Sequence, residues 1–179
     1  MPFETIQSDI KYRGRAFNVR CDQVRLPTGQ VSHLDIVDHV GAVTLIPMDD
    51  DGNILFVRQY RHAAGIELLE MPAGTLESGE LPEQCAQREI REETGMAARE
   101  LIKIGEFFLA PGYSTEYMSV YLATHLYSAP LQRDADEFLS LQKIAIEQAY
   151  QMASSGEIRD AKSLVALFLL KSHLENQKP

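Results

Sequence analysis

The segment 74–96, GTLESGELPEQCAQREIREETGM, constrains the fold more than any other part of this chain. It starts as a loop with two glycines and continues as a run rich in glutamate. Pro82 favours the first turn of a helix, because the backbone N–H that proline lacks has no helical partner there. Gly95 favours the end of the helix, where a residue with positive φ is commonly required. The segment therefore predicts a glycine loop that leads into a helix.

Three carboxylates share one stripe of this predicted helix. With 3.6 residues per turn, Glu89 and Glu93 lie one above the other and Glu92 lies beside them. Arg88 precedes Glu92 by four residues, a spacing at which two side chains meet on a helix. Like charges on one stripe destabilise a helix, and a divalent cation with oxygen ligands, such as Mg²⁺, removes that repulsion. A solvated acidic helix face is the alternative interpretation.

Composition narrows the classes of protein to which the chain can belong. Its 179 residues suffice for one well-packed domain, and a hydrophobic content of 45% argues against disorder. The formal net charge of −9 and the pI near 5.0 argue against nucleic acid as the main partner, because phosphate backbones attract basic surfaces.

The number of cysteines and the hydropathy of the chain favour a protein of the reducing cytoplasm over a secreted or membrane protein. Cys21 and Cys85 are too few and too far apart for a disulfide framework or a zinc site. Residues 1–14 lack the cationic start and apolar core of a secretory signal. The apolar run 164–170 is much shorter than the roughly 20 residues of a membrane-spanning helix. We therefore expect a cytoplasmic protein without a membrane partner.

Apolar periodicity predicts a mixed α/β protein. Residues 9–40 alternate as two or three strands, with a turn at 27–30 where Pro27 fixes φ and Gly29 permits a wide range of φ. Further strands are expected at 41–48, 53–61, 67–74, 101–110, 117–127 and 139–146. Later helices are expected at 147–156 and at 160–177, which Asp160 can cap. This order of elements indicates a mixed sheet packed between helices.

The acidic run 49–51 lies between two of these strands. Its composition is that of a calcium loop, but the bidentate glutamate of such a loop is missing at the required distance. We interpret the run as the turn of a β-hairpin that joins 41–48 to 53–61.

The glutamate helix and its loop resemble the signature of the Nudix hydrolase family. Segment 74–96 presents a glycine, five residues, Glu80, seven residues and then REIREETGM. Every defined position of the signature is filled, including the aliphatic sites at Ile90 and Met96. The resemblance implies the Nudix fold, an α/β/α sandwich with a mixed central sheet. Residues 41–179 are then the Nudix hydrolase domain, and residues 1–40 are an N-terminal β-strand extension.

Segments outside the signature are similar to the ADP-ribose pyrophosphatase branch of this family. They are VRQYR (57–61), LLEMPAG (68–74), PGYSTE (111–116), in which Pro111 stands where the branch carries a proline, and DADEF (134–138). The resemblance implies hydrolysis of the diphosphate bond of a nucleoside diphosphate linked to a sugar. For ADP-ribose the products are AMP and ribose 5-phosphate.

Other functions stay open within the resemblance. The enzyme alternatives are a GDP-mannose or other nucleotide-sugar pyrophosphatase, a dinucleoside polyphosphate hydrolase and a nucleoside triphosphate hydrolase. A Nudix regulator or RNA-binding scaffold without catalysis is a different class. Such a protein is expected to lose helix glutamates, and all of them are present here.

The resemblance also implies a Mg²⁺ site, with Mn²⁺ as the alternative metal. By position, the implied ligands are the carbonyl of Ala73 and the carboxylates of Glu89, Glu93 and Glu92, the last also a catalytic contributor. Glu80 is expected to brace the loop against the helix. Arg88 is expected to orient a glutamate and not to touch substrate.

The implied catalytic base is an acidic residue of the loop 134–137. Glu137 is the first choice, with Asp136 and Asp134 as alternatives, and an exposed acidic turn is the interpretation without function. The implied substrate-binding residues are Arg61, Arg58, Glu116 and Gly74. The guanidinium fork of Arg61 suits the diphosphate, and Arg58 either assists it or faces solvent. Glu116 contacts a ribose, supports the metal or caps its loop.

The N-terminal strands bear on specificity and assembly. Aromatic residues that could stack on a substrate are Tyr12, Phe17 and Tyr113, but core packing is the expectation for each. Because proteins of this branch commonly exchange such strands across a two-fold interface, the resemblance implies a homodimer.

Overall fold

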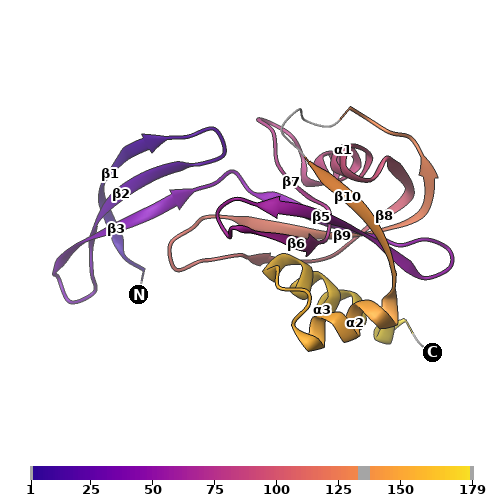
Figure 1. The fold of residues 1–179 in the computed structure, drawn as a ribbon. Helices are drawn as coiled ribbons and strands as arrows, with labels where there is room; N and C mark the ends of the chain where they lie inside the picture. Colours follow the sequence, from indigo (N-terminus) through magenta and orange to yellow (C-terminus); the bar gives the residue numbers. More distant parts are fainter. Residues whose placement is uncertain (1, 133–137, 178–179) are drawn as a thin grey trace. The chain divides into compact units, whose positions relative to one another are not determined.

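The structure is a computed structural model that describes residues 2–132 and 138–177 (Figure 1). It divides into two compact units. The first contains residues 1–41 and 107–118, and the second contains residues 42–106 and 119–179. The predicted division into an extension and a Nudix domain stays a prediction.

The first unit is built on a three-stranded antiparallel sheet. Its strands are β1 (Glu4–Arg13), β2 (Asn18–Arg25) and β3 (Val31–Asp38), in the order β1-β2-β3. The predicted turn between the second and third strands is confirmed, since the N–H of Leu26 donates to the carbonyl of Gln30 at 2.8 Å. Gly29 has a φ of 87° in this turn, where a residue with a side chain would be strained.

A loop from the middle of the chain packs against β3 in this unit. The N–H of Val37 donates to the carbonyl of Tyr113 at 2.8 Å, and the carbonyl of Val37 accepts the N–H of Thr115 at 3.0 Å. The expectation that the aromatic candidates pack in a core is wrong: Tyr12, Phe17 and Tyr113 are 59%, 43% and 60% exposed. The physical reason is that the described part of this unit contains no helix to cover its sheet.

The second unit contains the remaining elements. Its strands are β4 (Ala42–Pro47), β5 (Asn53–Arg61), β6 (Ile66–Glu70), β7 (Ala73–Thr75), β8 (Met96–Phe108), β9 (Tyr117–Ser128) and β10 (Leu139–Ala145), of which β8 and β9 each have one end in the first unit. Its helices are α1 (Pro82–Thr94), α2 (Ile146–Ser155) and α3 (Ala161–Asn176). The strands form two sheets, in the orders β10-β5-β6 and β7-β4-β9-β8.

The core of this unit is organised around β4, which is buried along its whole length. Side chains alternate along a strand, so Val43 and Leu45 face one side of the sheet and Ile46 faces the other. Val43 and Leu45 pack with Ala86 and Ile90 of α1. Helix α3 contacts the same strand and buries three apolar side chains of its own. The predicted helix–sheet–helix arrangement of an α/β protein is confirmed.

Two predicted strand connections differ from the structure. The chain turns back at 49–52 as expected, and a β-bridge joins Met48 to Ile54, but β4 and β5 continue into different sheets. The predicted strand 67–74 is two strands, because β6 pairs with β5 whereas β7 pairs with β4. Pro72 lies between β6 and β7, where the chain passes from one sheet to the other, and its carbonyl accepts the N–H of Leu45 at 2.8 Å.

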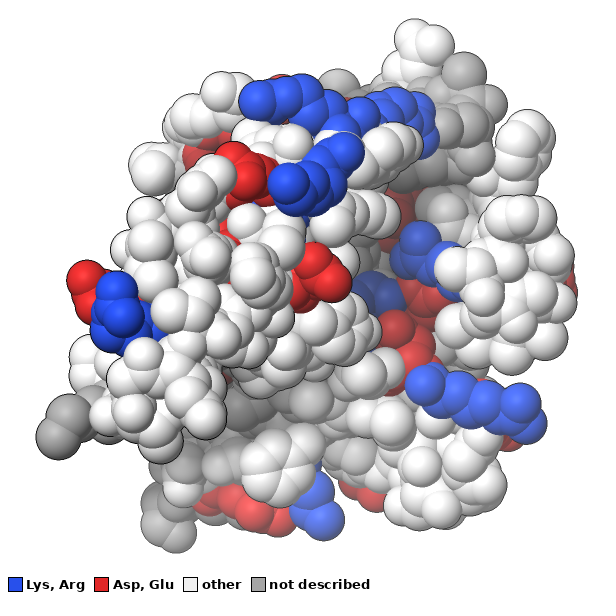
Figure 2. Space-filling view, turned by 90° about the vertical axis from the view of Figure 1, so that its left-hand side faces the viewer, with Lys and Arg blue, Asp and Glu red and all other residues white. Residues whose placement is uncertain are grey.

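The surface carries both signs of charge. Figure 2 shows lysine and arginine side chains next to aspartate and glutamate side chains on one face of the molecule. Within the described residues, no helix combines the length and the apolar character needed to cross a membrane.

Candidate active site

The glycine loop enters the site through strand pairing. Short strand β7 runs antiparallel to the buried strand β4, with Gly74 opposite Val43 and Ala73 opposite Thr44. Helix α1 packs on both strands and brings its carboxylates to the same place. The buried sheet therefore fixes the backbone of Ala73 and Gly74, and α1 supplies the charged side chains.

Local signals place α1 as the sequence predicts. The helix begins at Pro82, and the N–H of Leu81 before it donates to Oε1 of Gln84 at 3.0 Å. Gly95 follows the helix with a φ of 71°, and its N–H donates to the carbonyl of Arg91. Both predicted boundaries are confirmed.

Two glutamates of α1 are buried against the glycine loop. Glu93 is 3% exposed, and its Oε2 accepts the N–H of Ala73 at 3.1 Å. Glu89 is 6% exposed and lies directly against Gly74: a Cβ placed on this glycine would stand 1.8 Å from the carboxyl group. The φ of Gly74 is not positive, so the close approach of Glu89 is the structural reason for glycine at this position.

Arg88 holds the acidic side chains together. Its guanidinium donates to Glu80 at 2.9 Å through both Nε and Nη2, to Glu89 at 2.5 Å and to Glu92 at 2.9 Å. It also reaches the carbonyl of Thr75 at 3.2 Å. The contact of Arg88 with Glu92 that the helix spacing predicts is confirmed. These bonds, those to Glu80 first, raise the pKa of Arg88.

Glu80 braces the loop against the helix, as predicted. Its Oε2 accepts the N–H of Glu77 in the loop at 2.9 Å, and both of its oxygens accept hydrogen bonds from Arg88. Because the hydrogen bonds from Arg88 favour the ionised form, they lower the pKa of Glu80 to about 2.

This lowered pKa gives a pH-dependent prediction for stability. Glu80 ionises at 4.5 in its unperturbed state and at about 2 in the folded protein. Its contribution to the free energy of unfolding is therefore full above pH 4.5 and is lost as the pH falls towards 2. We expect Glu80→Gln to be less stable than the wild type at pH 6, and the difference to shrink across this range. Urea unfolding at a series of pH values measures it, with the exposed Glu83→Gln as the matched control. A difference that does not change with pH contradicts this assignment.

The chemistry of the donor set fits a divalent cation. In the described part of the chain, no three His, Cys, Asp or Glu side chains meet in an arrangement that holds a metal ion. The side chains available as metal ligands nevertheless carry hard carboxylate oxygens, and two of these side chains, Glu89 and Glu93, are buried. Glu80, Glu89 and Glu92 bond to one arginine, and Glu93 of the same helix bonds to the glycine loop, which leaves an excess of negative charge that a cation offsets. The ligand roles of Ala73, Glu89, Glu92 and Glu93 stay predictions.

Arg61 lies at the end of β5 and is tied to a buried carboxylate. It donates Nε and Nη2 to the two oxygens of Glu70, at 2.7 and 2.6 Å. The hydrogen bonds that Arg61 donates to Glu70, together with the charges of Glu70, Glu93 and Asp160, raise the pKa of Arg61. The guanidinium therefore lies within electrostatic reach of Glu93 on α1.

The other predicted residues have different hydrogen-bond partners or lie outside the described part of the chain. Arg58 lies on the opposite face of β5 from Arg61, because side chains alternate along a strand, and it approaches Oε1 of Gln142 at 3.5 Å. Glu116 belongs to the first unit, where its N–H donates to Oγ of Ser114 at 3.1 Å. The loop positions Glu137, Asp136 and Asp134 lie outside the described residues.

Sequence reasoning missed Glu70 and Lys162. Glu70 stands between apolar residues in LLEMP, an isolated charge that could have marked a buried ion pair. Lys162 comes two residues after Asp160, whose carboxylate caps α3 by accepting the N–H of Ser163 at 3.0 Å. The predicted cap of this helix is confirmed.

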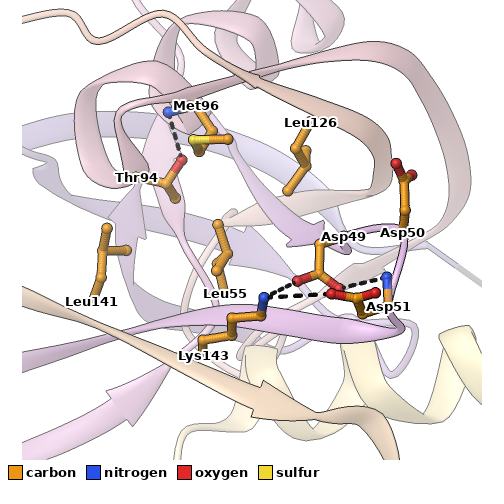
Figure 3. A pocket seen from close by; sticks show the side chains of 9 residues that line it. All are labelled: Asp49, Asp50, Asp51, Leu55, Thr94, Met96, Leu126, Leu141 and Lys143. Carbon is orange, nitrogen blue, oxygen red and sulfur yellow. Dashed lines mark hydrogen bonds and ion pairs between the residues drawn. The ribbon is translucent and has the colours of Figure 1, made fainter.

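A separate cavity of about 480 Å³ lies beside the acidic turn (Figure 3). Its apolar lining is formed by Leu55, Met96, Leu126 and Leu141. The carboxylate of Asp49 accepts the N–H of Asp51 at 3.0 Å and of Asn53 at 2.8 Å and pairs with Lys143 at 2.6 Å. Asp49 is thus used to close the turn, which confirms the interpretation of the acidic run as a turn.

Known proteins are similar to this chain in sequence and in fold. The NUDIX domain model matches residues 38–167. The chain is 37% identical over 179 residues to the ADP-ribose pyrophosphatase of Bacillus subtilis (strain 168), across 98% of this chain and 97% of that protein. It is 47% identical over 125 residues to the ADP-ribose pyrophosphatase of Mycobacterium tuberculosis (strain ATCC 25618 / H37Rv), across 69% of this chain and 60% of that protein.

The fold is shared more widely than the sequence. A crystal structure of an ADP compounds hydrolase superposes with a TM-score of 0.87 at 22% identity, across 99% of this chain and 96% of that one. This similarity confirms the predicted fold class. Because the family model covers most of the chain and the glutamate helix occupies its expected place, the chain belongs to the Nudix family.

Proposed function

We propose that this Nudix pyrophosphohydrolase cleaves the diphosphate bond of nucleoside diphosphate sugars, and that its substrate is ADP-ribose. Water adds to one phosphorus atom, the bridging P–O bond breaks, and the products are AMP and ribose 5-phosphate. Similarity to two ADP-ribose pyrophosphatases supports the choice of substrate.

One observation carries the proposal: an arginine fork, fixed by its bidentate bond to Glu70, feels the charge of the buried carboxylate of Glu93 on the Nudix helix. Arg61 suits bidentate binding of phosphate oxygens, and Glu93 contributes to the raised pKa of its guanidinium. Hydrolysis of a diphosphate requires both an anion-binding group and a site of concentrated negative charge for a cation. Arg61 and α1 supply these two parts.

The residues of the chain have distinct roles in this proposal. Ala73, Glu89, Glu92 and Glu93 hold Mg²⁺, or Mn²⁺ in its place, and Arg88 and Glu80 fix the helix and the loop around them. A cation held there would lower the pKa of a water molecule and neutralise phosphate oxygens. Arg61 binds the diphosphate, and Glu116 contacts the ribose. The acidic composition and the two free cysteines support a location in the cytoplasm.

Glu137 is the proposed general base, and its replacement gives a kinetic prediction. A base acts in the transition state, so Glu137→Gln is expected to lower kcat by about 100-fold or more and to change KM little. Steady-state kinetics with ADP-ribose measures both constants. If kcat is unchanged, Asp136 or Asp134 is the base instead, and Asp136→Asn and Asp134→Asn are the next variants to test.

The N-terminal sheet supports a homodimer. Every residue of β1 is exposed, and the exposed apolar residues of this unit include Phe3, Ile6 and Ile10. Exposed apolar patches of this kind mark interaction surfaces. We expect light scattering at micromolar concentration to give twice the mass of one chain, and Ile6→Lys/Ile10→Lys to shift it to the mass of one chain. A mass of one chain for the wild-type protein would contradict the proposed homodimer.

A substrate screen tests the proposed function. Purified protein is incubated with Mg²⁺ and with ADP-ribose, GDP-mannose, UDP-glucose, diadenosine polyphosphates or nucleoside triphosphates, and the products are separated by chromatography. The highest kcat/KM is expected for ADP-ribose, with AMP as a product. If another of these compounds has a higher kcat/KM, that compound and not ADP-ribose is the substrate. If none of them is hydrolysed, the proposed function is rejected.

A further inference from the structure

Glu70 is a carboxylate almost without solvent contact. Its side chain is 1% exposed at the end of β6, where an ionised group is unfavourable unless cations pair with it. Arg61 bonds to both of its oxygens, and Lys162 donates Nζ to Oε2. Burial acts to raise the pKa of Glu70, but the hydrogen bonds from Arg61 and the charge of Lys162 outweigh it and leave the pKa lowered. Glu70 is therefore ionised and shared by two cations.

The bond to Glu70 fixes the plane of the Arg61 guanidinium. A guanidinium has five N–H donors, and one edge of this group is occupied by the carboxylate. Among the described residues, no other side chain forms a hydrogen bond with this guanidinium. The Arg61 side chain is 43% exposed, so its outer edge is accessible to an anion.

Lys162 is itself held in place from two sides. Its side chain is 9% exposed, and Nζ pairs with Asp160 at 2.9 Å as well as with Glu70. Asp160 is fixed in turn, because it caps α3 through the N–H and the hydroxyl of Ser163. Met71, next to Glu70, donates its N–H to the same hydroxyl at 2.7 Å. The start of α3 and the end of β6 thus form one hydrogen-bonded unit.

The alternation of positive and negative side chains in this network determines how much positive charge Arg61 keeps for binding an anion. Arg61, Glu70, Lys162 and Asp160 alternate in sign along the network. Without Lys162, Arg61 would be the one cation beside the two carboxylates of Glu70 and Asp160. Their negative charge would exceed the positive charge of Arg61, and a diphosphate would meet net negative charge. With Lys162, Glu70 divides its charge between two cations and Arg61 keeps positive charge for the substrate.

We propose that Glu70 and Lys162 are a positioning pair for Arg61, in which Lys162 compensates the buried carboxylate and Glu70 orients the guanidinium towards the diphosphate. This inference rests on the proposed function, because it takes Arg61 as the group that binds the diphosphate. Neither residue of the pair needs to touch the substrate. Their effect passes through Arg61.

A double-mutant cycle tests this coupling. Lys162→Met is expected to raise KM for ADP-ribose about tenfold with a much smaller change in kcat, because the pair acts on binding. Once Arg61→Ala has removed the guanidinium, adding Lys162→Met is expected to change KM by less than about twofold. An unchanged KM in the wild-type background, or an equal rise in both backgrounds, overturns the proposal. A residue that only stabilises the fold would alter the melting temperature without this dependence on Arg61.

Two further variants keep the result interpretable. Lys171→Met removes an exposed lysine from the same helix and is expected to leave KM unchanged. If Lys162→Met does not fold, Glu70→Gln/Lys162→Met removes both charges of the buried pair together. The double variant is expected to keep a raised KM because Arg61 has lost its ionic fork, and a wild-type KM overturns the proposal.

Failure of the proposed function is recognised separately. It appears as a wild-type protein that hydrolyses no diphosphate compound in the screen. In that case calorimetric Kd values for inorganic pyrophosphate replace KM in the same cycle. Weaker binding by Lys162→Met that depends on Arg61 supports the positioning pair, and equal binding by all variants overturns it.

Discussion

Glu93→Gln is expected to lower the turnover of ADP-ribose by about two to three orders of magnitude while the fold survives. The side chain is 3% exposed, and its Oε2 accepts the N–H of Ala73 at 3.1 Å. Glutamine has nearly the same size and retains an oxygen that accepts this hydrogen bond, so the loop keeps its anchor. What the substitution removes is one negative charge from the group of carboxylates that is proposed to hold the cation. The expected loss therefore lies in catalysis and not in folding.

The measurement pairs initial rates at saturating Mg²⁺ with thermal unfolding. Glu83→Gln is the matched control, since it removes the same charge from an exposed position in the first turn of α1. The control is expected to keep wild-type turnover. A folded Glu93→Gln protein with turnover near that of the wild type would remove Glu93 from the proposed ligand set.

Local signals were sufficient to predict the elements that hold this site. Pro82 and Gly95 mark the two ends of α1 through backbone chemistry that does not depend on the rest of the fold. The strand 53–61 was predicted with the bounds that β5 has in the structure, because an apolar run at 54–57 follows the turn and leads to the charged end of the strand. The contact between Arg88 and Glu92 follows from helix spacing alone.

Long-range pairing could not be predicted in the same way. Glu70 and Lys162 are 92 residues apart, and their contact depends on how α3 packs beside β6. The division of 67–74 into two strands depends on a choice between two partner strands, and periodicity carries no information about that choice. Exposure of Tyr12 was missed for a related reason: an alternating strand predicts an apolar face but not whether another layer covers it.

Gly74→Ala is expected to disrupt the site by steric means, with every charge retained. A Cβ on Gly74 would stand 1.8 Å from the carboxyl carbon and Oε1 of Glu89 and 2.4 Å from its Cγ. Atoms cannot approach this closely, so Glu89 must leave its place beside Arg88, or β7 must shift on β4. We expect turnover to fall at least as far as in Glu89→Ala, together with a loss of about 1–3 kcal/mol in the free energy of unfolding. Urea unfolding and initial rates with ADP-ribose measure the two effects.

The combined variant Gly74→Ala/Glu89→Ala identifies the cause of this loss. If the clash with Glu89 is the reason for glycine, adding Gly74→Ala to Glu89→Ala costs less than about 0.5 kcal/mol, because the truncated side chain leaves room for the new methyl group. Turnover stays low in the combined variant, since the carboxylate is absent. An equal cost in both backgrounds would assign the requirement for glycine to the pairing of β7 with β4. In that case the first glycine of the Nudix signature would serve the strand and not the carboxylate of the helix.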